Sequence, residues 1–245
     1  MQGINNKEVA KLIMQALNFK QEGNLISAEL NLKKALKIEP DNFIVLNNLG
    51  NIYSVKNQLN KAKNFFSRAI NIKQDYSSAI FNLALINEEM GNKKVAVGLY
   101  KNAIKYDPDN LGFHYNLSRI DETFFNNNNI KNVKRILKNE KNSNFNKSSG
   151  FFILAHDQRI KIDLKKEFKY LTEAHKYFHL SNEKVNNQIS FYWIRLMPKI
   201  IKKFNFSSEK QIPKKIKPIF IMGLPRSGST LIENILCSGK KTIPN

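Results

Sequence analysis

The residues best suited to chemistry lie near the end of the sequence, in the stretch PIFIMGLPRSGSTLIENIL at 218–236. Residues 219–222 form a short, wholly apolar run, which is typical of a buried parallel strand. A turn over 223–228 follows, and from Thr230 onward leucine and isoleucine recur at helical spacing. Backbone N–H groups in such a loop and the N-terminus of the next helix create positive potential. The stretch therefore predicts a binding site for an anion of the phosphate or sulfate type.

This loop differs from a nucleotide P-loop at one decisive position. Gly223, Gly228 and Thr230 fit the pattern G-x-x-x-x-G-K-[ST], but Ser229 stands where the lysine belongs. A nucleoside triphosphatase needs that lysine because it bridges the terminal phosphates. ATP or GTP hydrolysis is therefore disfavoured, and Arg226 places a cation inside the loop instead.

The motif PRSGST, with an apolar strand before it and L…IL after it, resembles the 5′-phosphosulfate-binding segment of sulfotransferases. It is similar to that of protein-tyrosine sulfotransferases and their bacterial relatives, and the donor of sulfotransferases is 3′-phosphoadenosine 5′-phosphosulfate. The resemblance implies that the donor is held by Gly223, Arg226, Ser227, Gly228, Ser229 and Thr230. Ser229 replaces the threonine that is commoner in the family but keeps the hydroxyl.

The same resemblance gives Arg226 a catalytic role. Its guanidinium would neutralise charge on the bridging oxygen while the sulfuryl group transfers, which is electrostatic stabilisation of the leaving group. The hydroxyls of Ser229 and Thr230 would donate to the phosphate. The acceptor is expected to carry a hydroxyl, and protein tyrosine, carbohydrate and small molecules are all open.

Other candidate sites carry less weight. His175 and His179 are four residues apart, but two histidines without a third ligand do not predict zinc. Cys237 lies in an apolar helical segment and is expected to be a buried thiol. Asp107 and Asp109 belong to a turn between repeats. We therefore expect no metal site.

Composition limits the remaining function classes. The chain has 245 residues, one cysteine and no stretch near the roughly 20 apolar residues of a membrane span. A cytoplasmic protein without a membrane partner is expected, and the single cysteine fits a reducing compartment. The net charge is +20, but lysine and asparagine are abundant together and no basic run is interleaved with aromatics. Compositional bias explains this charge better than a nucleic-acid partner does.

The elements before the loop repeat with a period of 34 residues. The segments AELNLKKALKIEPDN, AKNFFSRAINIKQDY and AVGLYKNAIKYDPDN begin at Ala28, Ala62 and Ala96 and align without a gap. Small residues at fixed places let two helices approach closely, and large apolar residues face the neighbouring helices. The other aligned sets are Ala16, Gly50 and Ala84; Leu32, Phe66 and Tyr100; Ala35, Ala69 and Ala103; Gly23, Asn57 and Gly91; and Pro40, Gln74 and Pro108.

This pattern resembles the tetratricopeptide repeat. Clear units cover 9–42, 43–76 and 77–110, and degenerate units cover 111–144 and 148–181. The fourth unit loses its register at FFNNNNIKN, and in the fifth Glu167 replaces the small alanine. The resemblance implies an all-α solenoid of helical hairpins over 1–181, wound into a right-handed superhelix with a concave face.

Two roles for this array stay open: binding of a peptide or protein in the groove, or a scaffold for the segment after it in the chain. Asn48, Asn82 and Asn116 recur at the same place in successive units, and an inward-facing row of asparagines could bind a peptide backbone. The recurrence also agrees with the high asparagine content of the chain.

The second domain is expected to begin close to the end of the sequence. Residues 182–212 predict a helical bridge and linker, and 213–245 predict the first strand, loop and helix of an α/β sulfotransferase domain. A domain of this type needs on the order of 100 residues. We therefore expect an N-terminal part of a longer enzyme that is inactive alone. A non-catalytic repeat adaptor is the alternative.

Overall fold

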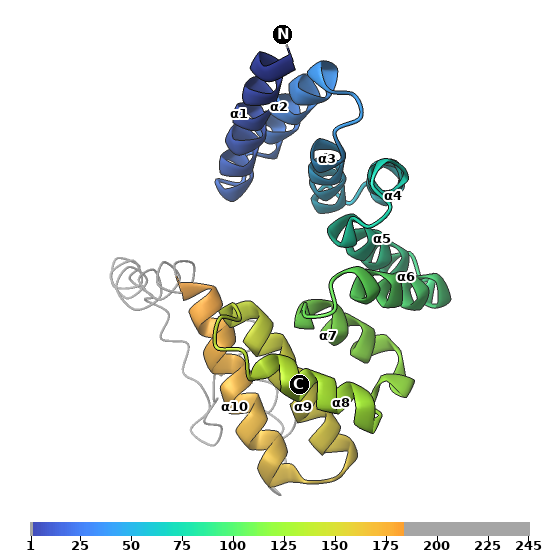
Figure 1. Ribbon diagram of the computed structural model, residues 1–245, viewed down its shortest axis with the longest axis vertical. Coiled ribbons are helices and arrows are strands. Elements are labelled where there is room, and N and C mark those ends of the chain that lie inside the picture. The colour runs from blue at the N-terminus through green and yellow to red at the C-terminus, as the bar shows by residue number, and fades with distance from the viewer. Residues whose placement is uncertain (1, 184–245) are drawn as a thin grey trace, which may run out of the picture. The chain divides into compact units, whose positions relative to one another are not determined.

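The computed structural model describes residues 2–183, with side-chain burial from residue 7 onward, and every regular element in this range is helical (Figure 1). The predicted bridge over 182–212 lies almost wholly outside the described residues. The predicted sulfotransferase segment over 213–245, including 223–230, lies entirely outside them. The described elements are α1 (Gln2–Gln21), α2 (Leu25–Ile38), α3 (Phe43–Val55), α4 (Leu59–Ile72), α5 (Ser77–Glu89), α6 (Lys93–Tyr106), α7 (Leu111–Ile120), η1 (Glu122–Phe124), α8 (Asn127–Leu137), α9 (Asn144–Ile160) and α10 (Leu164–Ser181).

The first six helices form three hairpins, α1–α2, α3–α4 and α5–α6. The aligned small residues lie at the contacts: Ala28, Ala62 and Ala96 are fully buried. The aligned large residues Leu32, Phe66 and Tyr100 are at most 2% exposed. The predicted repeat of small and large core positions is therefore confirmed in these three hairpins.

Gly50 shows why the small positions matter. A Cβ atom at Gly50 would lie 2.5 Å from Cε1 of the buried Phe66 ring. That separation is shorter than any van der Waals contact, so α3 and α4 can pack at this distance only with glycine here. Ala16 and Ala84 occupy the same place in the hairpins on either side and are also buried.

The turns inside the three hairpins have the predicted chemistry. Gly23, Asn57 and Gly91 have φ angles of 78°, 56° and 81°, in the left-handed region that glycine and asparagine tolerate best. The second helices end at Ile38, Ile72 and Tyr106, each two residues before the aligned Pro or Gln. The period of 34 residues is thus preserved in the backbone.

The fourth repeat departs from the hairpin arrangement. Helix α7 stops at Ile120, a short 3₁₀ turn comes next, and α8 begins at Asn127, so the loss of register seen in the sequence is a real break. Helix α7 packs mainly against α9 and α6. Gly150 of α9 permits this approach, because a Cβ atom there would lie 2.7 Å from Leu111 Cδ1.

Helices α9 and α10 form the last described hairpin. Leu154, Ala155 and Ala174 are buried, as the degenerate repeat predicts. Glu167, at the position of the missing small alanine, is 8% exposed, and its Oε1 accepts a hydrogen bond of 2.7 Å from Arg159 Nε. Pairing with arginine satisfies the carboxylate at a place where the first three units bury the methyl group of an alanine.

The buried apolar side chains form two main clusters. One joins α1 to α5 around Leu32, Leu49 and Phe66, and the other joins α5 to α9 around Tyr100 and Leu111. None of the helices described is both long and apolar enough to cross a bilayer.

Candidate functional site

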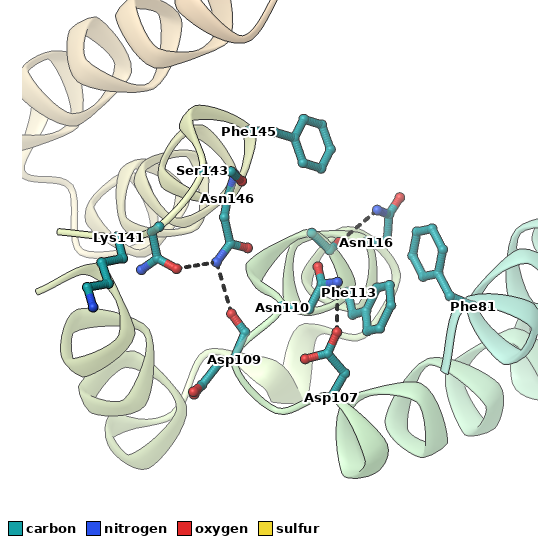
Figure 2. A pocket seen from close by; sticks show the side chains of 12 residues that line it. Phe81, Asp107, Asp109, Asn110, Phe113, Asn116, Lys141, Ser143, Phe145 and Asn146 are labelled. Carbon is teal, nitrogen blue, oxygen red and sulfur yellow. Dashed lines mark hydrogen bonds between the residues drawn. The ribbon is translucent and has the colours of Figure 1, made fainter. Parts of the chain in front are cut away.

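A pocket of about 430 Å³, which we call the α7–α9 pocket, lies at the turn that follows the third hairpin (Figure 2). Its walls come from α5, the turn between α6 and α7, helix α7, the turn before α9, and the first turn of α9. The lining residues are Phe81, Asp107, Asp109, Asn110, Gly112, Phe113, Asn116, Lys141, Asn142, Ser143, Phe145 and Asn146.

Asn146 holds the two sides of the pocket together. Its Oδ1 accepts a hydrogen bond of 2.6 Å from the backbone N–H of Leu111, the first residue of α7. Its Nδ2 donates to the backbone oxygen of Asp109 and to Asn142 Oδ1, both at 2.9 Å (Figure 2). One amide thus fixes the start of α7 to α9 by using its acceptor and both of its donor hydrogens.

Aromatic rings form the apolar part of the wall. Phe81 of α5 stacks on Phe113 of α7 with ring centroids 4.6 Å apart and an interplanar angle of 24°. Phe145, on the α9 side, is 55% exposed and lies over Gly112, where a Cβ atom would come within 3.1 Å of its ring. The missing side chain at Gly112 therefore keeps space open beside an exposed ring.

The polar part of the wall carries both signs of charge. Asp107 accepts a hydrogen bond of 3.1 Å from Asn110 Nδ2, and Asp109 pairs with Arg135 at 2.9 Å. Lys141 lies at the end of the pocket that is farther from Phe81 (Figure 2). The Asp109–Arg135 pair is well exposed on both sides, so water screens it strongly.

A buried histidine holds the turn beside the pocket. His114 follows the lining residue Phe113 in α7, and its Nε2 lies 2.8 Å from the backbone oxygen of Pro108. Burial lowers the pKa of His114, so the ring is neutral near pH 7 and holds the α6–α7 turn. Within residues 2–183 no group of three or more His, Cys, Asp or Glu is placed to hold a metal ion. What the pocket offers a ligand is aromatic surface bordered by amides and carboxylates.

The repeated asparagines have individual roles. Asn48 and Asn116 each donate to a backbone oxygen one turn earlier, of Ile44 and Gly112, at 2.9 Å. Asn82 donates to Asn47 Oδ1 of the neighbouring hairpin, also at 2.9 Å. The amide groups predicted to meet a peptide backbone therefore already have partners in the chain, although Asn116 does line the pocket.

Some of the remaining residues that the sequence singled out lie within the described part of the chain, and others lie outside it. His175 packs edge-on against the Phe152 ring, with centroids 5.2 Å apart, and Asp107 and Asp109 lie in the α6–α7 turn as expected. Cys237 and the loop at 223–230 lie outside the described residues. Sequence reasoning missed the α7–α9 pocket, although the register break beyond 120 and the glycine at 112 were visible signals.

A second pocket lies at the equivalent turn two repeats earlier. It is lined by Glu39, Pro40, Asp41, Asn42 and Phe43, and it has a similar volume of about 430 Å³. All of this lining comes from the turn and the first residue of α3. The turn alone therefore makes a pocket of this volume, and at the later turn α9 adds the Phe145 ring and the Asn146 amide to the lining.

Comparison with known families identifies two kinds of segment in the chain. Residues 31–64 and 77–110 match tetratricopeptide repeat families, and residues 218–244 match a family described as the sulfotransferase family. The described helices thus carry tetratricopeptide repeats, which generally bind peptides or proteins. These matches support a protein-interaction role for this part of the chain.

Two curated relatives each match about a third of the chain. An 80-residue segment is 34% identical to Protein O-mannosyl-transferase Tmtc3 of Drosophila melanogaster and covers 33% of this chain and 9% of that protein. A 91-residue segment is 35% identical to the uncharacterized protein ycf37 of Pyropia yezoensis and covers 35% of this chain and 51% of that protein. The chain therefore spans about half of one relative's length and a small part of the other's.

The fold is similar to that of solved repeat proteins. A crystal structure of nearly identical TPR-like repeats from a putative kinesin light chain of Podospora anserina superposes with a TM-score of 0.51 at 12% identity. The match covers 71% of this chain and 96% of that one. This likeness supports the all-helical, solenoid-like fold.

Proposed function

We propose that the chain belongs to a sulfotransferase that uses 3′-phosphoadenosine 5′-phosphosulfate and holds its protein partner or acceptor with tetratricopeptide repeats. One observation carries this proposal: repeat matches at 31–64 and 77–110 and a sulfotransferase match at 218–244 occur in one chain, in that order. The loop in the second segment has the composition of an anion site, and the described helices supply a binding surface.

The α7–α9 pocket is the proposed contact for the partner. An extended segment could place one apolar side chain between the Phe81–Phe113 pair and Phe145. Burial of such a side chain is worth about 1.5–3 kcal/mol, which is enough to fix the register of a bound segment. The amides and carboxylates of the rim would then meet the backbone on either side.

The loop from Gly223 to Thr230 is the proposed donor site. Its backbone N–H groups and the hydroxyls of Ser229 and Thr230 would bind the 5′-phosphate, because such a loop concentrates donors at a helix N-terminus. Arg226 would stabilise the negative charge that develops as the sulfur–oxygen bond to the donor breaks. The sulfuryl group would pass to a hydroxyl oxygen of the acceptor, which releases its proton, while adenosine 3′,5′-bisphosphate leaves. A tyrosine-containing peptide is the first acceptor to test.

The donor site is tested by replacing Arg226. Transfer of ³⁵S from labelled donor to a tyrosine-containing peptide would be measured with protein expressed from its full reading frame. We expect Arg226→Ala to lower kcat about 100-fold or more, as loss of a charge-stabilising group does. Lys214→Ala, which removes a charge before the predicted strand, is the matched control and should change kcat less than about twofold. Equal rates for wild type and Arg226→Ala would overturn the proposal.

The partner site is tested separately with Phe145→Ala. We expect KM for the peptide to rise about tenfold with kcat unchanged, since the ring contributes binding and not chemistry. Leu30→Ala removes a similarly exposed apolar side chain, 54% exposed on α2, and should leave KM unchanged. Retained peptide binding in a protein that never transfers sulfate would favour the adaptor function.

A further inference from the structure

Helix α10 presents an apolar stripe that no described element covers. Leu164 is 70% exposed, Phe168 74% and Phe178 48%, and the half-buried Leu171 lies between them. Their spacing of four, three and seven residues places all four on one side of the helix. The contacts of α10 with α9 are centred on the neighbouring side, where Glu167 and Ala174 are buried. His175, which shares the side of the four apolar residues, packs edge-on against Phe152 of α9. We call these four residues the α10 stripe.

The turn that leads into α10 extends this apolar surface at a cost in backbone strain. Ile162 has a φ of 59° and is 82% exposed, and Ile160 just before it is 55% exposed. The equivalent turn position in the first three hairpins holds Gly23, Asn57 or Gly91. A β-branched residue in the left-handed region costs roughly 1–2 kcal/mol and here buries little in return. An exposed, strained isoleucine fits a surface that meets another molecule.

Lysines border the stripe on its first turns. Lys165 and Lys169 are exposed on one flank of the stripe, and Lys161 lies in the turn before it, whereas Lys166 is exposed on the opposite side of the helix. Asp163 pairs with Lys166 at 2.7 Å, and Asp157 pairs with Lys161 at 2.8 Å. These pairs offset Lys161 and Lys166, and Glu173 pairs with Lys176 at 3.8 Å, so the basic charge on the flank of the stripe comes from Lys165 and Lys169.

We propose that the α10 stripe binds an amphipathic helix of a partner protein whose apolar face is bordered by acidic side chains. The stripe is about 21 Å long from Leu164 to Phe178, which matches about four turns of a facing helix. Its spacing is that of a helix–helix contact, in which side chains three and four residues apart interdigitate. A basic rim selects an acidic helix by charge complementarity.

A second copy of this chain fits the stripe less well. Two copies would bring their lysine rims together, and the net charge of +20 opposes self-association. The stripe also differs from the α7–α9 pocket, since the two share no residue. The inference therefore goes beyond the proposed function and stands independently of it.

The test uses two designed helical peptides as probes. Both carry leucine at heptad a and d positions over about three heptads, one flanked by glutamate and the other by lysine. Fluorescence anisotropy with the full chain should show that the glutamate peptide binds about tenfold or more tighter than the lysine peptide. Phe168→Ser should weaken binding of the glutamate peptide by about the same factor. Ile26→Ser, at a residue 78% exposed on α2, is the matched control and should leave binding unchanged.

Ile162→Gly gives a second readout in which stability and binding move in opposite directions. Relief of the left-handed strain should raise the melting temperature, while loss of the side chain should weaken binding of the glutamate peptide about threefold. Equal binding of both peptides, or no binding of either, would refute the proposal. So would a drop of several degrees in the melting temperature of Phe168→Ser, because the stripe would then be covered within the chain.

Two further outcomes would assign the stripe to a different occupant and overturn the proposal. The first is a dimer in sedimentation velocity that Phe168→Ser dissolves. The second is binding to phosphatidylserine vesicles that Phe168→Ser abolishes and the glutamate peptide does not displace.

Discussion

Two turns with nearly the same sequence, EPDNF at 39–43 and DPDNL at 107–111, use the same asparagine differently. In the first turn, Asn42 Oδ1 accepts hydrogen bonds from the backbone N–H groups of Ile44 and Val45 at 3.1 and 3.0 Å, so it caps its own helix. In the second, Asn110 makes no such cap, and the N–H of Leu111 is bonded to Asn146 instead.

The difference arises from the neighbouring helix. Next to the first turn, α3 packs in a regular hairpin and must satisfy its own N-terminus. Next to the second, α9 lies against α7 closely enough for Asn146 to reach across. A local cap has been replaced by a tertiary one, and the space left between the two helices is the α7–α9 pocket.

The largest effect should come from removing the tertiary cap. Asn146→Leu leaves the N–H of the buried Leu111 without its partner, and an unsatisfied buried group costs about 1–3 kcal/mol; it also removes the bond to the carbonyl of the exposed Asp109. We expect a loss of about 2–3 kcal/mol in the free energy of unfolding, measured by urea denaturation. Asn60→Leu, the same change at an exposed position of α4, should cost less than about 0.5 kcal/mol. Equal effects of the two would show that Asn146 does not join the helices.

An intermediate loss of stability is expected at acid pH, because protonation of Glu29 breaks ion pairs of the repeats. Burial alone would raise the pKa of Glu29, but hydrogen bonds from Lys33, Lys56 and Tyr53 outweigh it and lower the pKa from 4.5 to about 2. The lowered pKa means that this stabilisation is complete above pH 4.5 and is lost as the pH falls towards 2. After allowance for screening by water around Lys33, we expect a loss of about 1–2 kcal/mol.

The measurement is the difference in unfolding free energy between wild type and Glu29→Gln at several pH values. The difference should shrink steadily between pH 4.5 and about 2, because protonation removes in wild type what the substitution has already removed. Arg135→Gln, which breaks the exposed pair with Asp109, should change stability by less than about 0.5 kcal/mol at any pH. A pH-independent difference for Glu29→Gln would contradict the assignment.

The smallest predicted difference in stability is between variants of Asn42 and Asn110. Asn42→Ala removes a helix cap and should cost about 1 kcal/mol, whereas Asn110→Ala removes one hydrogen bond to Asp107 and should cost a few tenths. Thermal unfolding of the two variants side by side is sufficient to measure this. The reverse order would mean that Asn110 has a capping role that its geometry does not show.

Much of the repeat architecture was predictable from the sequence. The buried alanines at 28, 62 and 96 and the left-handed turns at 23, 57 and 91 are consequences of spacing and residue type. These features are local, because a hairpin is decided by residues within one period of each other. The sequence also located the place where the pattern fails, beyond residue 120.

The repeat pattern could not predict how the helices pack where the repeat register is lost. The proposed donor loop at 223–230 stays a prediction from motif and family match alone. The α7–α9 pocket depended on contacts between residues 35 or more positions apart, such as Asn146 with Leu111 and Asp109. Once α7 lost its hairpin partner, several helices were available to cover it, and no periodic signal chooses among them.

The sequence by itself determined the three hairpins, because steric fit between small and large side chains repeats every 34 residues and leaves no alternative register. Only the tertiary structure decided which asparagine caps α7 and which side of α10 stays exposed. Those outcomes depend on which helix lies within reach of a given backbone group in space. That choice is made by packing across the whole domain, and it is absent from any local pattern of residues.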